Sequence, residues 1–160
     1  KYTDINFYRL NLINSRELNS KLLNNLESLK ALDTLSLKKY DNVDLNVVDD
    51  ENRIAQSKEL DETIDLKIKS IDMYTIIKDF DNCLKTTKSP TLLSNCNYLY
   101  LKIAEPAIIT NEYKAEVKSL FTTYNATSNT QRSKGINRII PYHNKMIQNL
   151  EKNINSAISL

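Results

Sequence analysis

The chain has 160 residues, enough for about one domain, and its 41% hydrophobic and 26% charged residues are the balance of an ordinary globular protein. A single glycine, Gly135, excludes the dinucleotide-binding, phosphate-loop and nucleophile-elbow motifs, because each of them needs at least two glycines. The formal net charge of +2 gives no strong attraction to nucleic acid or to a membrane surface. All-β folds are disfavoured as well, because their tight turns depend on glycine.

Residues 2–37 are predicted to form the first helix. Apolar side chains such as Leu12, Leu22 and Leu26 recur there at helical spacing, and no glycine or proline interrupts them. Residues 38–50 break this period and are rich in Asp and Asn, the residues of turns and caps, so we expect a loop there.

Residues 51–87 predict the second helix, which Asp49 or Asp50 would cap at its N-terminus. Isoleucines such as Ile64 and Ile68 recur at steps of three and four. Acidic residues gather near its start and lysines near its end, which suits the helix dipole.

The third helix is predicted to begin at Ser89-Pro90, because Ser at the N-cap followed by Pro in the first turn is a common start signal. Its apolar stripe continues to Tyr124 but is interrupted by Pro106. An interior proline removes a backbone hydrogen bond and clashes one turn back. We therefore expect this helix to be kinked or broken near Pro106.

Residues 125–134 are polar and aperiodic, which predicts a loop ending at Gly135. Apolar residues from Ile140 to Ala157 then predict the fourth helix, with Pro141 at its start or kinking its first turn.

Four long helices with short connections predict an all-α fold, an elongated antiparallel four-helix bundle that forms one domain over residues 1–160. Both termini would lie at the same end of it. No stretch approaches 18 apolar residues, so no membrane span is expected within this segment. We interpret the chain as part of a longer protein whose targeting or anchoring segments lie elsewhere.

The two cysteines lie on either side of the predicted helix boundary. Cys83 precedes Ser89 by six residues and Cys96 follows Pro90 by six, so a helical hairpin would place their sulfurs at matching heights. A disulfide there would place the domain outside the cytoplasm. The alternatives are a pair of buried free thiols and, least favoured, a functional thiol.

His143 is the one histidine of the sequence and falls on the apolar stripe of the last helix. A packed, hydrogen-bonded core residue is the favoured interpretation. The sequence around it does not favour a phosphotransfer site, a closed zinc site would need carboxylates as well, and no acid lies three residues before His143 as a di-iron bundle requires. We expect no catalytic residue, no metal site and no cofactor.

Charge is unevenly distributed along the chain. Residues 41–65 hold nine acidic and two basic residues, whereas residues 117–150 hold five basic residues and no acidic one. Either the two surfaces lie near each other and partly cancel, or one of them meets a charged partner. The candidate anion or partner patch near the start of the fourth helix comprises Arg132, Lys134, Arg138 and Lys145.

These features favour a non-catalytic extracytoplasmic helical module that binds another protein at the cell envelope or outside the cell. The alternative is a ligand-sensing extracytoplasmic domain of a membrane receptor, which would dimerise along its first helix. The expected partner is a protein or a small-molecule ligand, not nucleic acid, and membrane contact would come only through segments outside this chain. A third class, an enzyme, would need a concave pocket with convergent acids or with His143 in it.

Asn125-Ala126-Thr127 matches the glycosylation sequon, but such a match arises easily in an asparagine-rich chain.

Overall fold

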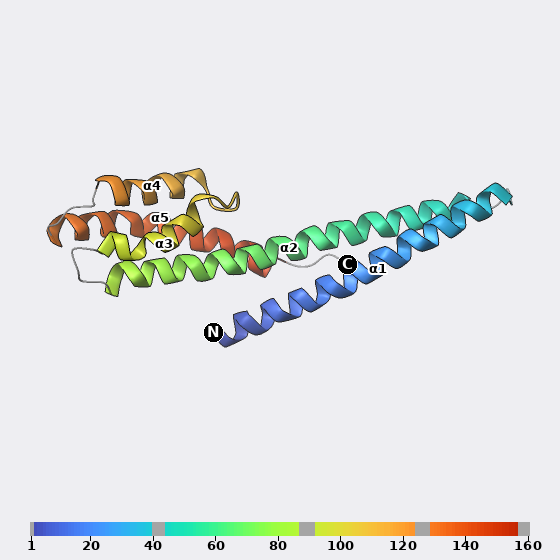
Figure 1. Cartoon of the computed structure of the whole chain (residues 1–160), viewed down its shortest axis with the longest axis horizontal. Coiled ribbons are helices and arrows are strands. Elements are labelled where there is room, and N and C mark those ends of the chain that lie inside the picture. Colours follow the sequence, from blue (N-terminus) through green and yellow to red (C-terminus); the bar gives the residue numbers. More distant parts are fainter. Residues whose placement is uncertain (1, 40–43, 87–91, 124–128, 157–160) are drawn as a thin grey trace. The chain divides into compact units, whose positions relative to one another are not determined.

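The computed structural model describes residues 2–39, 44–86, 92–123 and 129–156. These residues form helices and no strand, so the predicted all-α class is confirmed. Figure 1 shows the five helices, which are α1 (Tyr2–Lys39), α2 (Asp44–Thr86), α3 (Leu92–Ala104), α4 (Asn111–Thr123) and α5 (Asn129–Asn155).

The predicted four-helix arrangement is not confirmed, because two separate helices take the place of the third. α3 ends at Ala104, two residues before Pro106, which has no N–H to continue the helical ladder. The N–H of Ile109 instead donates to the carbonyl oxygen of Pro106 at 3.1 Å. Thr110 then caps α4, since its Oγ1 accepts a hydrogen bond from the N–H of Tyr113 at 3.3 Å.

The first helix matches its prediction, whereas the second begins earlier than predicted. α2 starts at Asp44, so the Asp- and Asn-rich residues from 44 to 50 are helical and Asp49 and Asp50 are not caps. Carboxylates in the first turns of a helix are favourable next to its positive end. Asp50 is moreover buried against α1, at 3% exposed. This turn of α2 therefore packs on α1.

α5 also begins earlier than predicted, at Asn129, so that Gly135 and Pro141 lie inside it. Gly135 is buried there and does not adopt a positive φ. Glycine inside a helix costs about 1 kcal/mol relative to alanine, less than the burial of the apolar face that carries Ile139 and Leu150 contributes. The predicted start signal Ser89-Pro90 and the sequon at 125–127 lie outside the described residues.

The described chain divides into two compact units. Unit 1 takes in the residues up to Ile68 together with Ser156, and unit 2 takes in those from Lys69 to Asn155. Helix α2 contributes its N-terminal part to unit 1 and the remainder to unit 2.

Unit 1 is built on an antiparallel pair formed by α1 and the N-terminal part of α2. The ion pairs show that the two helices are antiparallel. Arg16 of α1 pairs with Asp65 of α2 at 3.7 Å, and the later α1 residue Lys30 pairs with the earlier α2 residue Glu51 at 3.4 Å. The buried apolar side chains of the pair are widely spaced: on α1 they lie about four turns apart, and on α2 about three turns and then one turn apart. They are Leu12, Leu26, Ile54, Ile64 and Ile68. Polar residues separate them, so the seam between the helices is mixed in character.

Lys67 ties Ser156 to unit 1. Its side chain is 1% exposed, and its Nζ donates to the backbone oxygen of Ser156 and to Ser156 Oγ, the latter at 3.2 Å. Burial lowers the pKa of Lys67. These oxygens offset part of the cost of removing an ammonium group from water.

Unit 2 holds the larger apolar core, to which the C-terminal part of α2 and all of α3, α4 and α5 contribute. Phe80 is fully buried at its centre, with its ring centroid 6.1 Å from that of Phe121, which lies 4.9 Å from the ring of Tyr100. Aromatic pairs at such distances contribute beyond their buried area. The four helical segments are therefore held by one contiguous core.

Candidate interaction site

Helix α1 carries a second apolar face, which is largely exposed. Its members are 40% to 67% exposed, and at about 100° per residue they fall within an arc of about 80°. Leu12 and Leu26, which face α2, project about 100° away from the centre of that arc. We call this surface the α1 stripe, formed by Phe7, Leu18, Leu22, Leu29 and Leu32.

The polar positions within the α1 stripe are all uncharged. Between Phe7 and Ser36, the nine positions in the same arc follow one another at steps of three and four. Five of these positions belong to the apolar set. The other four are Asn11, Asn14, Asn25 and Ser36. A helix face of this length without a charge is unusual for a surface that only meets water.

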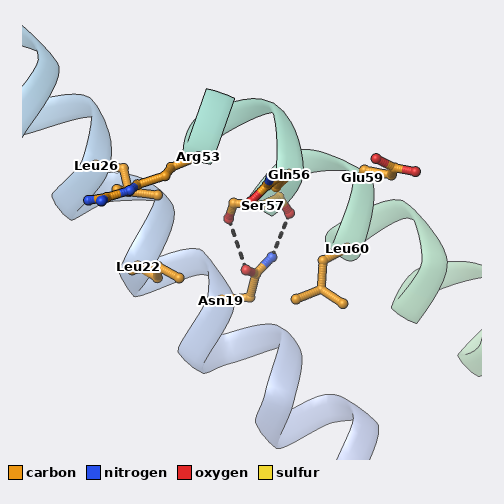
Figure 2. Close-up of a pocket in the computed structure, with 8 residues that line it drawn as sticks. All are labelled: Asn19, Leu22, Leu26, Arg53, Gln56, Ser57, Glu59 and Leu60. Atoms are coloured by element: carbon orange, nitrogen blue, oxygen red, sulfur yellow. Dashed lines mark hydrogen bonds between the residues drawn. The ribbon is translucent and has the colours of Figure 1, made fainter. Parts of the chain in front are cut away.

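A groove lies beside the α1 stripe, between α1 and α2. It has a volume of about 440 Å³, and Figure 2 shows Leu22 of the stripe at its α1 side and Leu60 on α2. At its centre, Asn19 Nδ2 donates to the backbone oxygen of Ser57 at 2.8 Å and Ser57 Oγ donates to Asn19 Oδ1 at 2.9 Å. The remaining lining residues are Leu26, Arg53, Gln56 and Glu59.

The reciprocal pair of Asn19 and Ser57 fixes how α1 and α2 meet. Both side chains are buried, and in this arrangement the Asn19 amide both donates and accepts while the Ser57 hydroxyl donates. A slip of one residue along either helix would bury the same polar atoms without partners, at a cost of about 1–3 kcal/mol for each group. The pair therefore holds the register that places Leu22 and Leu60 beside the groove.

A second polar contact in the seam joins Asp50 to Asp33. A hydrogen bond with the Asp33 side chain raises the pKa of Asp50, burial and the charges of Asp33 and Asp49 act in the same direction, and Arg53 opposes them. Asp50 Oδ2 is buried and has no hydrogen-bond partner in the described part of the chain. An ionised Asp50 is thus unfavourable in unit 1.

We expect Asp50→Asn to stabilise unit 1 at neutral pH. Because the folded pKa lies above the ordinary 3.8, the native carboxyl contributes most below pH 3.8, and that contribution is lost as the pH rises through the folded pKa. The amide of Asn removes the charge at constant size. The increase in the free energy of unfolding should therefore be large at neutral pH and should shrink in acid. Hydrogen exchange of α1 amides measures it. Asp49→Asn is the control, since Asp49 is exposed and pairs with Arg53 at 3.2 Å; equal effects of the two changes would contradict the prediction.

In unit 2, His143 is the buried core residue that its position in the sequence predicts. It is 5% exposed, its Nδ1 lies 3.3 Å from the hydroxyl of Tyr113, and its Nε2 lies 3.9 Å from Asp81 Oδ2. Burial lowers the pKa of His143, Asp81 raises it, and Lys78 and Lys85 lower it further. Burial raises the pKa of Tyr113, and Asp81 adds to the rise.

Unit 2 should lose stability on mild acidification. The folded pKa of His143 lies below its ordinary 6.5, so the unfolded chain takes up a proton first and stability falls as the pH drops below 6.5. Thermal unfolding from about pH 8 to about pH 5 covers this window. We expect His143→Gln to flatten the dependence, while Tyr113→Phe, which keeps the imidazole, retains it. A slope unchanged in His143→Gln would show that other groups cause it.

Three of the four residues of the predicted basic patch, Lys134, Arg138 and Lys145, lie on one exposed face of α5 within an arc of about 40°. Arg132 is buried, and it projects about 160° away from Lys134 around the axis of α5. Arg138 pairs with Glu116 of α4 at 3.3 Å and Lys145 pairs with Glu112 of α4 at 3.4 Å, so carboxylates of the same unit already match two of the four charges. The acidic residues of 44–65 belong to unit 1 and the basic residues of α5 to unit 2.

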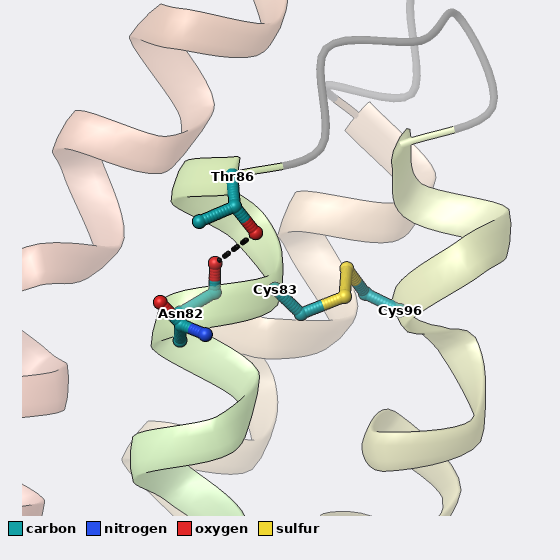
Figure 3. Close-up of a disulfide and its surroundings, with 4 residues drawn as sticks. All are labelled: Asn82, Cys83, Thr86 and Cys96. Atoms are coloured by element: carbon teal, nitrogen blue, oxygen red, sulfur yellow. Dashed lines mark hydrogen bonds between the residues drawn. A yellow bond between two sulfur atoms is a disulfide. The ribbon is translucent and has the colours of Figure 1, made fainter.

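The predicted disulfide is present. Cys83 of α2 and Cys96 of α3 are bonded, with their Cα atoms 6.0 Å apart (Figure 3). Cys96 is fully buried in the core of unit 2. The link closes a loop with a sequence separation of 13 residues and joins two of the helices that build that core.

The sequence prediction missed the α1 stripe because it treated all leucines of α1 as one face. Spacing places Leu22 on one stripe with Leu12 and Leu26, yet Leu22 is exposed whereas the other two are buried. The signal was present in the spacing, since Leu18, Leu22, Leu29 and Leu32 form their own series of helical steps.

Comparison of the chain with protein-family models, with curated proteins and with solved structures found no match. Within the described residues, no three His, Cys, Asp or Glu side chains are grouped as a metal site would require. None of the described helices combines the length and the apolar character needed to cross a bilayer.

Proposed function

We propose that this protein is a non-catalytic extracytoplasmic helical module that binds another protein at the cell envelope or outside the cell. The observation that carries the proposal is the α1 stripe. Large contiguous apolar patches are rare on proteins that remain alone in solution, and they commonly mark interaction sites.

The mixed seam of unit 1 supports this proposal. Two helices joined by a seam that includes Asn19, Ser57 and Asp50 bury few apolar side chains for their length. Most helix stability in proteins comes from packing an apolar face. A partner on the α1 stripe would supply the burial that α2 does not.

The location outside the cytoplasm is part of the proposal. The disulfide between Cys83 and Cys96 fits an oxidising environment, because cytosolic thiols are normally kept reduced. Two free thiols in protein purified from the cells that make it would count against this location.

Site-specific photo-cross-linking tests the proposed function. A photoreactive phenylalanine replaces Leu22 in the stripe or, as a control, Glu27, which is exposed on the opposite side of α1. We expect a discrete protein adduct from position 22 and none from position 27. No adduct from Leu22, or the same adducts from both positions, would contradict a binding role for the stripe.

The groove favours a second candidate function, the sensing of a small ligand. Its volume of about 440 Å³ lies in the range of ligand sites, and polar groups among leucines are typical of such sites. Native mass spectrometry of the chain from its own host would show a bound small molecule, which Leu60→Trp should displace by filling the groove. A spectrum of the unliganded mass alone would remove this candidate.

A further inference from the structure

We infer that the partner of the α1 stripe is a second copy of this chain, so that α1 packs on α1 of the other copy. The inference rests on the proposed function, because it names the partner of the same surface. Three properties of the stripe carry it: its pattern, its charge and its symmetry.

The pattern is that of a helix–helix seam. Of the nine positions from Phe7 to Ser36, five are apolar and four are Asn or Ser, and the run from Leu18 to Leu32 keeps the spacing of coiled-coil packing over about two heptads. The stripe and the buried seam lie roughly a third of a turn apart on α1. A helix with two such faces is suited to contact two neighbours, and α2 occupies one of the faces.

The charge pattern favours an identical partner over a lipid or nucleic-acid surface. Two copies of one surface repel each other wherever it is charged, and the stripe has no charge. A helix that lies on a membrane carries Lys and Arg on its polar face, and phosphate recognition needs the same residues. The positions flanking the stripe carry one basic residue, Lys21, against the acidic residues Glu17 and Asp33.

The four leucines of the stripe lie almost symmetrically about Asn25. Leu18 and Leu32 lie seven residues on either side of Asn25, with Leu22 and Leu29 between. Two copies pairing through the stripe would place Asn25 opposite Asn25 of the second copy in either helix direction. An asparagine at one inward position of a helix pair is a known means of fixing register, at some cost in stability.

The adjoining groove adds to the fit. Side chains of one helix enter holes between side chains of its partner in this kind of packing. The space between Leu22 and Leu60 lies directly beside the stripe. A leucine of the second copy would enter it.

Sedimentation of the full oxidised chain tests the inference. We expect a concentration-dependent dimer, whose Kd the double variant Leu22→Lys/Leu29→Lys raises about 100-fold or more, since two leucines lose their burial. Glu27→Lys is the matched control, because it adds a lysine on the far side of α1, and it should leave Kd unchanged. Circular dichroism verifies that the variants remain helical, which is expected because Leu22 and Leu29 are 50% and 40% exposed.

Disulfide cross-linking gives an independent measurement. The described cysteines are paired, so Asn25→Cys introduces a new thiol at the centre of the stripe. We expect rapid oxidation to a covalent dimer, whereas Glu27→Cys should not form one. A wild-type chain that stays monomeric, or equal cross-linking of the two variants, would overturn the inference. A monomer that still gives a discrete adduct with a different protein from position 22 would leave the proposed function standing and refute only self-association.

Discussion

Removing the disulfide between Cys83 and Cys96 is expected to lower the free energy of unfolding of unit 2 by about 3 kcal/mol. The bond closes a loop with a sequence separation of 13 residues, which restricts the unfolded chain. Its loss therefore favours the unfolded state even where the native contacts persist. Urea unfolding of the oxidised chain and of Cys83→Ala/Cys96→Ala measures the difference.

Reduction of the native chain separates the cross-link from the side chains. Cys96 is fully buried, so the alanine variant also loses packing around that position. The reduced chain keeps both sulfur atoms and loses only the covalent link. Equal stability of the oxidised and reduced chains would contradict the prediction and would leave the bond without a structural role in unit 2.

Phe80→Ala is expected to destabilise unit 2 by about 3–5 kcal/mol. Phe80 is fully buried, and its ring packs with that of Phe121. Alanine would leave a cavity between α2 and the helices packed on it, because the surrounding side chains relax only in part. Urea unfolding, followed by hydrogen exchange in α4 and α5, would detect the loss.

An exposed aromatic residue provides the matched control. Tyr98 of α3 is 57% exposed, so Tyr98→Ala removes a comparable side chain with little loss of burial and should change stability by about 0.5 kcal/mol or less. Amides of α1 should respond weakly to Phe80→Ala, since they belong to unit 1. A loss below that of Tyr98→Ala would show that Phe80 does not anchor the core.

The spacing of apolar residues predicted where the long helices lie, whereas it did not predict the residues at which α2 and α5 begin. α1 agrees with the prediction within two residues. The start of α2 was wrong because Asp and Asn are common in both loops and first turns, and only the packing of Asp50 against α1 assigns it to the helix. The start of α5 was wrong because the local preference of Gly135 for a helix end is outweighed by the burial of the helix face on which it lies.

The interaction surface could be predicted only in part. The sequence contains both series of leucines on α1, but spacing alone does not say which of them meets α2. The reciprocal hydrogen bonds between Asn19 and Ser57 decide that, because they set the rotation and register of the two helices. Likewise, the sequence does not show that Arg138 and Lys145 pair with Glu116 and Glu112 of α4, because these contacts depend on how α4 packs on α5.

The sequence by itself predicted the all-α class, an interruption of the helix near Pro106, the disulfide between Cys83 and Cys96 as the favoured of three alternatives, and the burial of His143. These features depend on local spacing and on the chemistry of single residues, which a linear pattern records. Only the tertiary structure decided that unit 1 pairs α1 with part of α2 and leaves the α1 stripe exposed. That outcome depends on contacts between residues about 20 to 50 positions apart, whose relative energies no local pattern contains.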